Sequence, residues 1–108
     1  MAQAKNVIAF PIPATPGPSA DELVAQIRED MAAGRMAFDH SHFRERLAKN
    51  RVSMRQVMEV LKEGTAVSVP KLDPYGDWRI KLRMKVAGRR VRVVVAVGEE
   101  GSTAVTVF

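Results

Sequence analysis

Three residues near the middle of the chain carry groups that could do acid–base chemistry. His42, Glu45 and Arg46 fall within about one turn of a predicted helix, so their side chains can lie close together. An imidazole can act as general acid or base near neutral pH, a carboxylate can orient it or act as the base, and a guanidinium can hold a phosphate. This set fits metal-independent RNA cleavage, in which one group takes the 2′-hydroxyl proton and another protonates the leaving oxygen.

A simpler interpretation of His42 is that it packs at the start of the helix and forms a hydrogen bond with the backbone, and we prefer this interpretation. We expect His40 to be exposed. Asp39 also offers a metal ligand, but these residues on a connector do not make a metal site. The sequence has no Gly-rich phosphate loop and no nucleophile elbow. We therefore expect no metal and no cofactor.

A second set of residues gives one side of the predicted strands a dense positive charge. Basic and apolar residues alternate in "WRIKLRMKV", and the next strand adds two arginines on the same side. The side chains are Arg79, Lys81, Arg83, Lys85, Arg90 and Arg92. Like charges that face each other across strands repel, so such a face invites a counter-charge. It could bind RNA phosphates, or it could be a solvated face relieved by Glu59, Glu63 or acids of the N-terminal region.

Aromatic and apolar residues in the same region refine this picture. Trp78 shares the apolar side of its strand with Ile80, so we expect it in the core rather than stacked on a base. Tyr75 remains a candidate for base stacking. Val94 and Ala96 are apolar although they belong to the basic side. They indicate that a strand, the tail or a second chain partly covers this face.

The hydrophobic period changes from 3.6 to two residues at Thr65. Helical spacing and the capping boxes at 19–22 and 53–56 predict helices over 20–33, 41–50 and 54–63. Gly34 and Gly64 fit the ends of the first and third helices. Alternation predicts strands over 65–71, 78–86, 90–97 and 103–108. Residues 36–38 form either a short strand or an extended connector.

This order of elements predicts an α+β domain. Two to three N-terminal helices pack on one face of a three- to four-stranded antiparallel sheet and leave the other face open. We expect one domain over 19–108, preceded by a flexible Pro-rich tail over 1–18. "NVIAF", ahead of the prolines, could pair as an edge strand or dock on a partner, with disorder as the first expectation.

The charge of the chain is unevenly placed. The 108 residues carry a net charge of +5, with three basic and five acidic residues in 1–40 and fourteen basic and seven acidic residues in 41–108. A basic body favours nucleic acid or an acidic protein as a partner. The absence of cysteine excludes disulfides and a catalytic thiol. No apolar run could span a bilayer or serve as a signal peptide, so we expect no membrane partner and a cytoplasmic location.

The order and spacing of these segments resemble the domain-of-unknown-function family 4258. "HFRERLAKNRVSMRQVMEVLKEG" corresponds to its helical pattern, and "GDWRIKLRMKVAGRRVRVVVAV" with "AVTVF" corresponds to its strand meander, over about residues 36–108. The matching positions are His42, Glu45, Arg46, Leu47, Val57, Val60, Leu61, Gly64, Gly76, Asp77, Trp78, Arg79 and 88–96.

This family is similar to the barnase–EndoU–colicin–RelE-type fold group, so the resemblance implies a RelE/ParE-toxin-like fold. Many members of that group are metal-independent ribonucleases and toxins that use the open sheet face and often a helix-borne histidine. The resemblance implies the fold more firmly than the activity. If the chain is an enzyme, we expect His42 as acid or base, Glu45 to orient it or act as base, and Arg46, Arg79 and Arg83 on the phosphate. RNA and an antitoxin would then be partners.

Three hypotheses follow. The first is an RNA-binding or metal-independent ribonuclease protein of the toxin-like group. The second is a non-catalytic interaction module whose basic face receives an acidic protein. The third is a stable relative with neither activity. The sequence does not indicate an oligomeric state.

Overall fold

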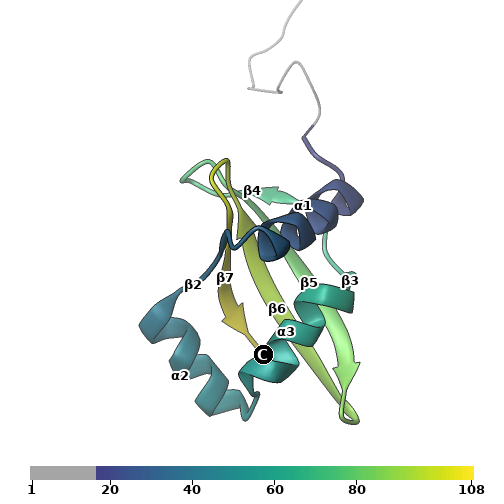
Figure 1. Cartoon of the computed structure of the whole chain (residues 1–108), viewed down its shortest axis with the longest axis vertical. Coiled ribbons are helices and arrows are strands. Elements are labelled where there is room, and N and C mark those ends of the chain that lie inside the picture. The colour runs from purple at the N-terminus through teal and green to yellow at the C-terminus, as the bar shows by residue number, and fades with distance from the viewer. Residues whose placement is uncertain (1–16) are drawn as a thin grey trace, which may run out of the picture.

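The structure, a computed structural model, describes residues 17–108 apart from the side chain of His40. Over this range three helices pack against a mixed six-stranded sheet (Figure 1), which confirms the predicted α+β architecture. The helices are α1 (Ala20–Ala32), α2 (His40–Asn50) and α3 (Met54–Glu63). The strands are β2 (Met36–Phe38), β3 (Thr65–Ala66), β4 (Lys71–Leu72), β5 (Trp78–Val86), β6 (Arg89–Val97) and β7 (Ser102–Val107).

The sheet has more strands than expected and is not purely antiparallel. Its order is β2-β7-β6-β5-β3, and β4 also pairs with β5. Residues 36–38 are a strand rather than a connector, and this strand runs parallel to β7 with Met36 opposite Ser102. The predicted strand over 65–71 forms two short strands on the same partner. Pro70 lies between them, where its missing N–H could not serve a continuous ladder.

Both predicted capping boxes are present. The Ser19 hydroxyl accepts from the Glu22 N–H at 3.1 Å, and the Glu22 carboxylate accepts from the Ser19 N–H at 2.8 Å. Ser53 and Gln56 make the same exchange at the start of α3, at 3.1 and 2.9 Å. Each exchange satisfies two backbone donors that a helix start leaves without intrahelical partners.

Two glycines follow helices as predicted, but for different physical reasons. Gly34 has a φ of +76°, which is a left-handed conformation that glycine adopts without strain. Gly64 has an ordinary φ of −68°. A Cβ there would lie 2.5 Å from the Val60 carbonyl oxygen and 3.1 Å from that of Arg83. Gly64 is therefore required because α3 ends in close contact with β5.

The core lies between the helices and one face of the sheet. Apolar side chains of all three helices, of the connection between α2 and α3, and of β5, β6 and β7 form it: Leu23, Ile27, Phe43, Val52, Val57, Val60, Leu61, Ile80, Leu82, Val91, Val93, Val95, Val97, Ala104 and Val107. Trp78 is half-buried against this cluster, as expected. Because side chains alternate along a strand, burial of Ile80 and Leu82 directs their neighbours in β5 to the opposite face.

A buried polar cluster fastens α1 to β7. The Ser102 hydroxyl donates to Asp30 at 2.6 Å, and both residues are 1 % exposed. Gln26 and Arg35 also donate to the Asp30 carboxylate, at 2.9 and 3.0 Å. Burial alone would raise the pKa of Asp30, but hydrogen bonds from Ser102, Gln26 and Arg35, with the Arg35 charge, hold this pKa below its ordinary value.

The segment "NVIAF" and nearly all of the predicted tail over 1–18 lie outside the described residues. Leu23 and Ile27 of α1 enter the common core, so α1 packs as part of the same unit as the sheet. Between residues 17 and 108, no helix has the length and apolar character that crossing a membrane requires.

Candidate nucleic-acid interface

The face of the sheet opposite the helices carries paired positive charges. In the register of β5 and β6, Arg83 is opposite Arg92, and Lys85 is opposite Arg90. We call these four residues the cationic row. Arg83, Lys85 and Arg90 are exposed, whereas Arg92 is half-buried. The hairpin therefore brings like charges together in two consecutive cross-strand pairs.

The turn of this hairpin determines how close the paired side chains come. Ala87 and Gly88 have φ values of 52° and 78°, as in a two-residue turn whose twist matches the strands. Val86 and Arg89 close the turn as Cα partners. Counting from this hydrogen-bonded pair, the two pairs of the cationic row are of the non-hydrogen-bonded kind. In such pairs the Cα atoms lie only about 4.5 Å apart.

Arg79, at the other end of β5, is neutralised. Its Nε donates to the Asp73 carboxylate at 3.1 Å. Asp73 also accepts from the N–H groups of Tyr75 and Asp77 in the turn before β5. Desolvation would raise the pKa of Asp73, but these backbone hydrogen bonds and Arg79 hold it below its ordinary value.

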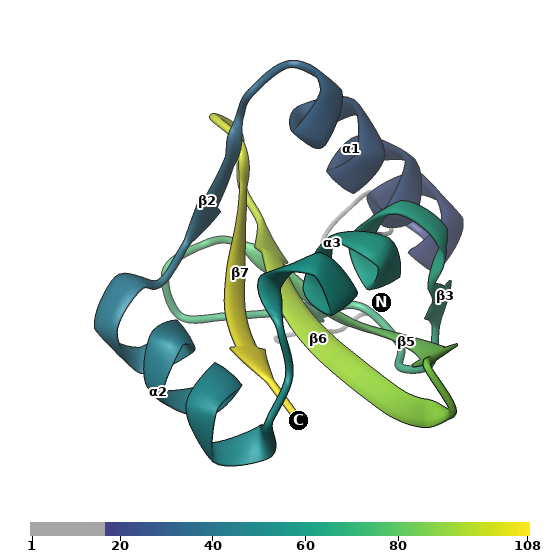
Figure 2. The same cartoon turned by 60° about the horizontal axis from the view of Figure 1, so that its bottom comes forward.

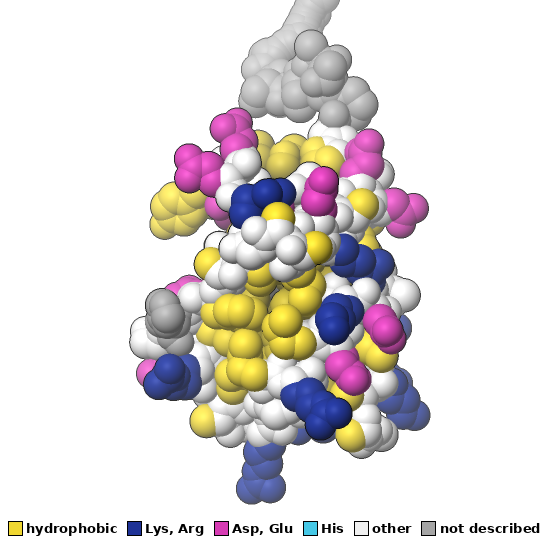
Figure 3. All heavy atoms as spheres, viewed as in Figure 1, with side chains coloured by type: hydrophobic (Ala, Val, Ile, Leu, Met, Phe, Trp, Pro, Cys, Tyr) yellow, Lys and Arg dark blue, Asp and Glu magenta, His cyan; other side chains and the backbone are white. Residues whose placement is uncertain are grey.

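The cationic row has no such partner among the described residues. The two ion pairs found there join Arg35 to Asp30 and Arg79 to Asp73. Glu59 and Glu63 do not neutralise the cationic row as the alternative interpretation expects. Both residues lie on α3, which packs on the opposite face of the sheet. The helix-covered face differs, because both acidic and basic side chains surround its central apolar patch (Figure 3).

Lys81, and with it Arg92 of the cationic row, lies over an aromatic ring on the open face. The Lys81 ammonium lies 5.1 Å from the centroid of the Phe108 ring, and the Arg92 guanidinium lies 5.5 Å from it. Phe108 exchanges two backbone hydrogen bonds with Arg92, at 2.7 and 2.9 Å, and its side chain is 37 % exposed. The sequence interpretation missed Phe108, because strict alternation from the buried Ala104 would place it on the core face, and only the register shift between Val94 and Val95 turns it to the open face.

A shallow hollow of about 240 Å³ lies on the same face and shares Lys81 with this ring. Its lining is mostly apolar and is formed by Ser68, Val69, Lys71, Arg79, Ile80, Lys81 and Val94. The Ser68 hydroxyl accepts from the Lys81 N–H at 2.9 Å, which fixes the connection between β3 and β4 on β5. Ala96 is 6 % exposed and Val94 is half-buried. The chain itself therefore covers part of the face at these two positions. Cover by the tail or by a second chain stays a prediction.

Arg89, which the sequence interpretation did not single out, fixes the far end of the hairpin. Its guanidinium donates to the carbonyl oxygens of Asn50 and Arg51 at the end of α2. Asn50 in turn donates to the Val107 carbonyl oxygen at 3.0 Å. The ribbon that carries the cationic row is therefore tied to a helix rather than projecting freely.

The predicted acid–base residues lie on another element. His42, Glu45 and Arg46 belong to α2, which packs on β7 at the side of the sheet away from β5 (Figure 2). His42 lies about two turns from Asn50, the end of α2 that Arg89 contacts. His42 and Glu45 are exposed and Arg46 is half-buried. No ion pair joins the three in the part of the chain that the structure describes.

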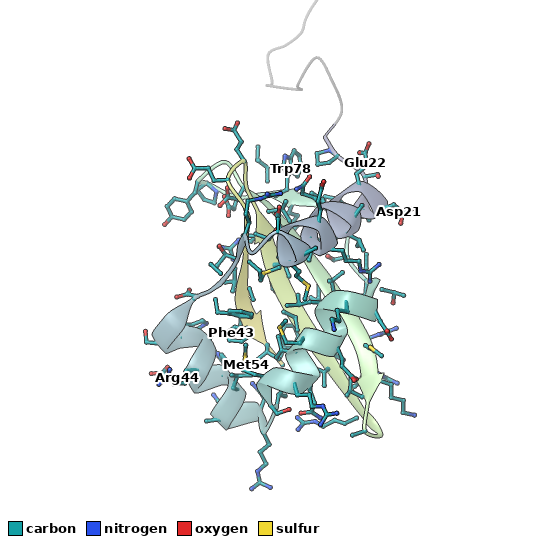
Figure 4. The ribbon with its side chains drawn as sticks, viewed as in Figure 1. Asp21, Glu22, Phe43, Arg44, Met54 and Trp78 are labelled. Atoms are coloured by element: carbon teal, nitrogen blue, oxygen red, sulfur yellow. The ribbon has the colours of Figure 1, made fainter. Side chains whose placement is uncertain are left out.

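The packing residue at the start of α2 is Phe43 rather than His42. Phe43 is 2 % exposed and its ring centroid lies 5.3 Å from that of Phe38. In Figure 4 Phe43 points from α2 toward β7, whereas Arg44 points outward. The preferred interpretation of His42 as a packing residue is therefore wrong, because its side chain is exposed. Among the described side chains, no three His, Asp or Glu residues gather as a metal ion requires.

The comparison with known families gives one match. The family model described as "Domain of unknown function (DUF4258)" matches residues 40–108, from the first residue of α2 to Phe108. This range agrees with the resemblance expected from the sequence and leaves out α1 and β2. No curated protein matches the chain. The wider likeness to the RelE-type fold group stays a prediction.

Proposed function

The chain belongs to this domain-of-unknown-function family, and for this member we propose that the open face of the sheet binds RNA through the cationic row without cutting it. The family name carries no activity, so the proposal rests on the chemistry of the face alone.

The observation that carries the proposal is the pairing of Arg83 with Arg92 and of Lys85 with Arg90, with no carboxylate within ion-pair distance in the described range. Like charges directly opposite each other destabilise a sheet by roughly 0.2–1 kcal/mol per pair. A bound polyanion removes this repulsion and releases its own counterions, so both terms favour binding.

The residue types favour phosphate over carboxylate side chains of a protein partner. Three of the four residues in the row are arginines, whose planar guanidinium can donate two hydrogen bonds to one phosphate. Alternate residues of a strand lie about 6.6–6.8 Å apart, so each strand presents its cations at a regular interval. A phosphate backbone is a regular series of charges that can follow such a ribbon.

The position of His42 supports binding rather than cleavage. A general acid or base must lie within hydrogen-bond reach of the proton that it transfers. His42 lies at the far end of α2 from the contact between that helix and the hairpin. Phosphates held on the row would therefore leave the imidazole remote from the reacting atoms.

A salt titration with variants tests this function. We would measure the anisotropy of a fluorescent mixed-sequence RNA at several salt concentrations and then examine the RNA on a gel. Four phosphate contacts predict that log K falls with log[salt] with a slope of about −3. We expect R83E/R92E to weaken binding by at least about tenfold. The control R44E/R55E makes the same charge change at exposed sites on α2 and α3 and should bind nearly as the parent does.

Four outcomes would overturn the proposal. Absence of RNA binding at low salt, or equal losses in the two double variants, would mean that the row is not a phosphate surface. Binding of polyglutamate as tight as that of RNA would favour an acidic protein partner. RNA that is cut by the parent but not by His42→Ala would favour the ribonuclease hypothesis instead.

A further inference from the structure

We infer that the open face takes its nucleic acid as a single strand, with one base in the hollow formed by Val69 and Val94 and a neighbouring base on the ring of Phe108. This inference rests on the proposed function and specifies the substrate class of the same face. It follows from the apolar surfaces that lie beside the cationic row.

The hollow offers a base an apolar floor and a charged rim. Val69 is 73 % exposed and Val94 is half-buried, and both line the hollow. Lys71 and Lys81 line it as well and supply the charge of its rim. Arg79 also lines it but is already paired with Asp73. An apolar floor holds the flat face of a base out of water, whereas a cationic rim suits the phosphate attached to that base.

Phe108 offers a second base an aromatic surface. In the free protein Lys81 and Arg92 lie over its ring. A base stacked on an aromatic side chain gains more than an exposed cation gains over the same ring. A base that displaces either cation also frees it to meet a phosphate. The ring thereby gains a stronger stacking partner, and the displaced cation gains a phosphate.

Lys81 joins the two base positions. Its side chain lines the hollow, and its ammonium lies over the Phe108 ring. Arg92, the other cation over that ring, belongs to the cationic row and is opposite Arg83. The apolar positions and the phosphate positions thus form one continuous surface across β5 and β6.

A double helix could use the cations but not the apolar positions. Its bases are stacked inside and present only their edges, whereas a single strand can lay unstacked bases on apolar and aromatic side chains. The exposed apolar side chains beside the cations therefore favour a single strand. RNA and DNA share this chemistry, so the inference covers both.

The test compares four ligands of equal length on the full chain: single-stranded RNA, single-stranded DNA, an RNA duplex, and an abasic strand that keeps the phosphates. We expect both single strands to bind about tenfold or more tighter than the abasic strand. Val69→Ser should reduce this advantage and leave abasic binding unchanged, whereas Phe108→Leu should reduce the advantage and, because it frees Lys81 and Arg92, should not weaken abasic binding. Leu72→Ser is the matched control, because Leu72 is 59 % exposed near the same sheet edge but does not line the hollow.

The outcomes separate the inference from the proposed function. Equal binding of abasic and normal strands, tighter binding of the duplex, or equal effects of Val69→Ser and Leu72→Ser would overturn the inference and leave phosphate binding standing. Failure to bind any of the four ligands would overturn both. Thermal unfolding of each variant checks that the substituted proteins are folded.

Discussion

Arg83 and Arg92 are Cα partners across β5 and β6, and within the described residues neither has a carboxylate within ion-pair distance. This pair lies at the centre of the open face, with Lys85 and Arg90 next to it. The fold therefore keeps a repulsion that a single substitution would remove.

Arg83→Thr should stabilise the protein at low salt. The substitution removes the charge that faces Arg92 and leaves a residue that strands favour. We expect a gain of roughly 0.2–1 kcal/mol in the free energy of unfolding at about 20 mM salt, which shrinks at about 1 M because salt screens exposed charges. Urea unfolding at both salt concentrations measures it. A gain that does not depend on salt would show that repulsion is not the cause.

Asp30→Asn should destabilise the protein at neutral pH and much less in acid. The pKa of Asp30 lies below its ordinary value of 3.8, so the ionised carboxylate stabilises the fold above that pH. This contribution is lost as the pH falls through the pKa of the folded state. At pH 7 the change leaves the donors of Ser102 and Arg35 poorly matched, at a cost of about 1–3 kcal/mol.

Urea unfolding of the parent and of Asp30→Asn from neutral pH down to about pH 3 measures this difference. The gap between the two proteins should narrow below about pH 4. Glu99→Gln, an exposed substitution in the turn before β7, is the control and should follow the parent throughout. A constant gap across the range would contradict the assignment of the stabilisation to the ionised Asp30.

The two helix-ending glycines should respond differently to alanine and asparagine. Gly64→Ala places a Cβ against the carbonyl oxygens of Val60 and Arg83, and we expect a loss of about 1–3 kcal/mol. Gly64→Asn should cost at least as much. Gly34 has open space around it and only requires a left-handed backbone, which asparagine tolerates better than alanine. Thermal unfolding of the alanine and asparagine variants at both positions measures these costs. An unchanged midpoint for Gly64→Asn would contradict the steric explanation at position 64.

Ala87→Asn should stabilise the hairpin. Ala87 has a φ of 52° in the two-residue turn, where asparagine is favoured. We expect a gain of roughly 0.5–1 kcal/mol, since a left-handed backbone costs alanine about 1–2 kcal/mol. Ala33→Asn, outside the turn and without a left-handed backbone, is the comparison. An unchanged midpoint for Ala87→Asn in thermal unfolding would mean that the turn conformation is not as described.

Local chemistry predicted much of this fold from the sequence. The capping boxes at Ser19 and Ser53 and the alternation along β5 depend on neighbouring residues, so they could be recognised without the fold. β2 could not be assigned in the same way, because three residues acquire a strand conformation only by pairing with β7. The division of the segment at Pro70 into β3 and β4 also depends on the partner strand.

The candidate site, like β2, depends on contacts between distant segments that the sequence pattern does not show. Alternation placed six basic residues on one face, but it could not show that Arg79 is neutralised by Asp73, which precedes it by six residues across a turn. Spacing suggested that His42, Glu45 and Arg46 might act together, yet no sequence pattern could show that α2 packs on β7. Phe108 lies over the open face only because its strand register pairs it with Arg92. Val69 lines the hollow only because Ser68 holds the connection between β3 and β4 on β5.

The most direct measurement is an amide chemical-shift titration of the isotope-labelled protein with single-stranded RNA at low salt. We expect the largest shifts in β5 and β6 around Lys81, Arg83, Lys85, Arg90 and Arg92, together with Val69 and Phe108. Amides of α1 and α3 should move little. Shifts concentrated on the helices, or no shifts at all, would contradict the assignment of the open face as the binding surface.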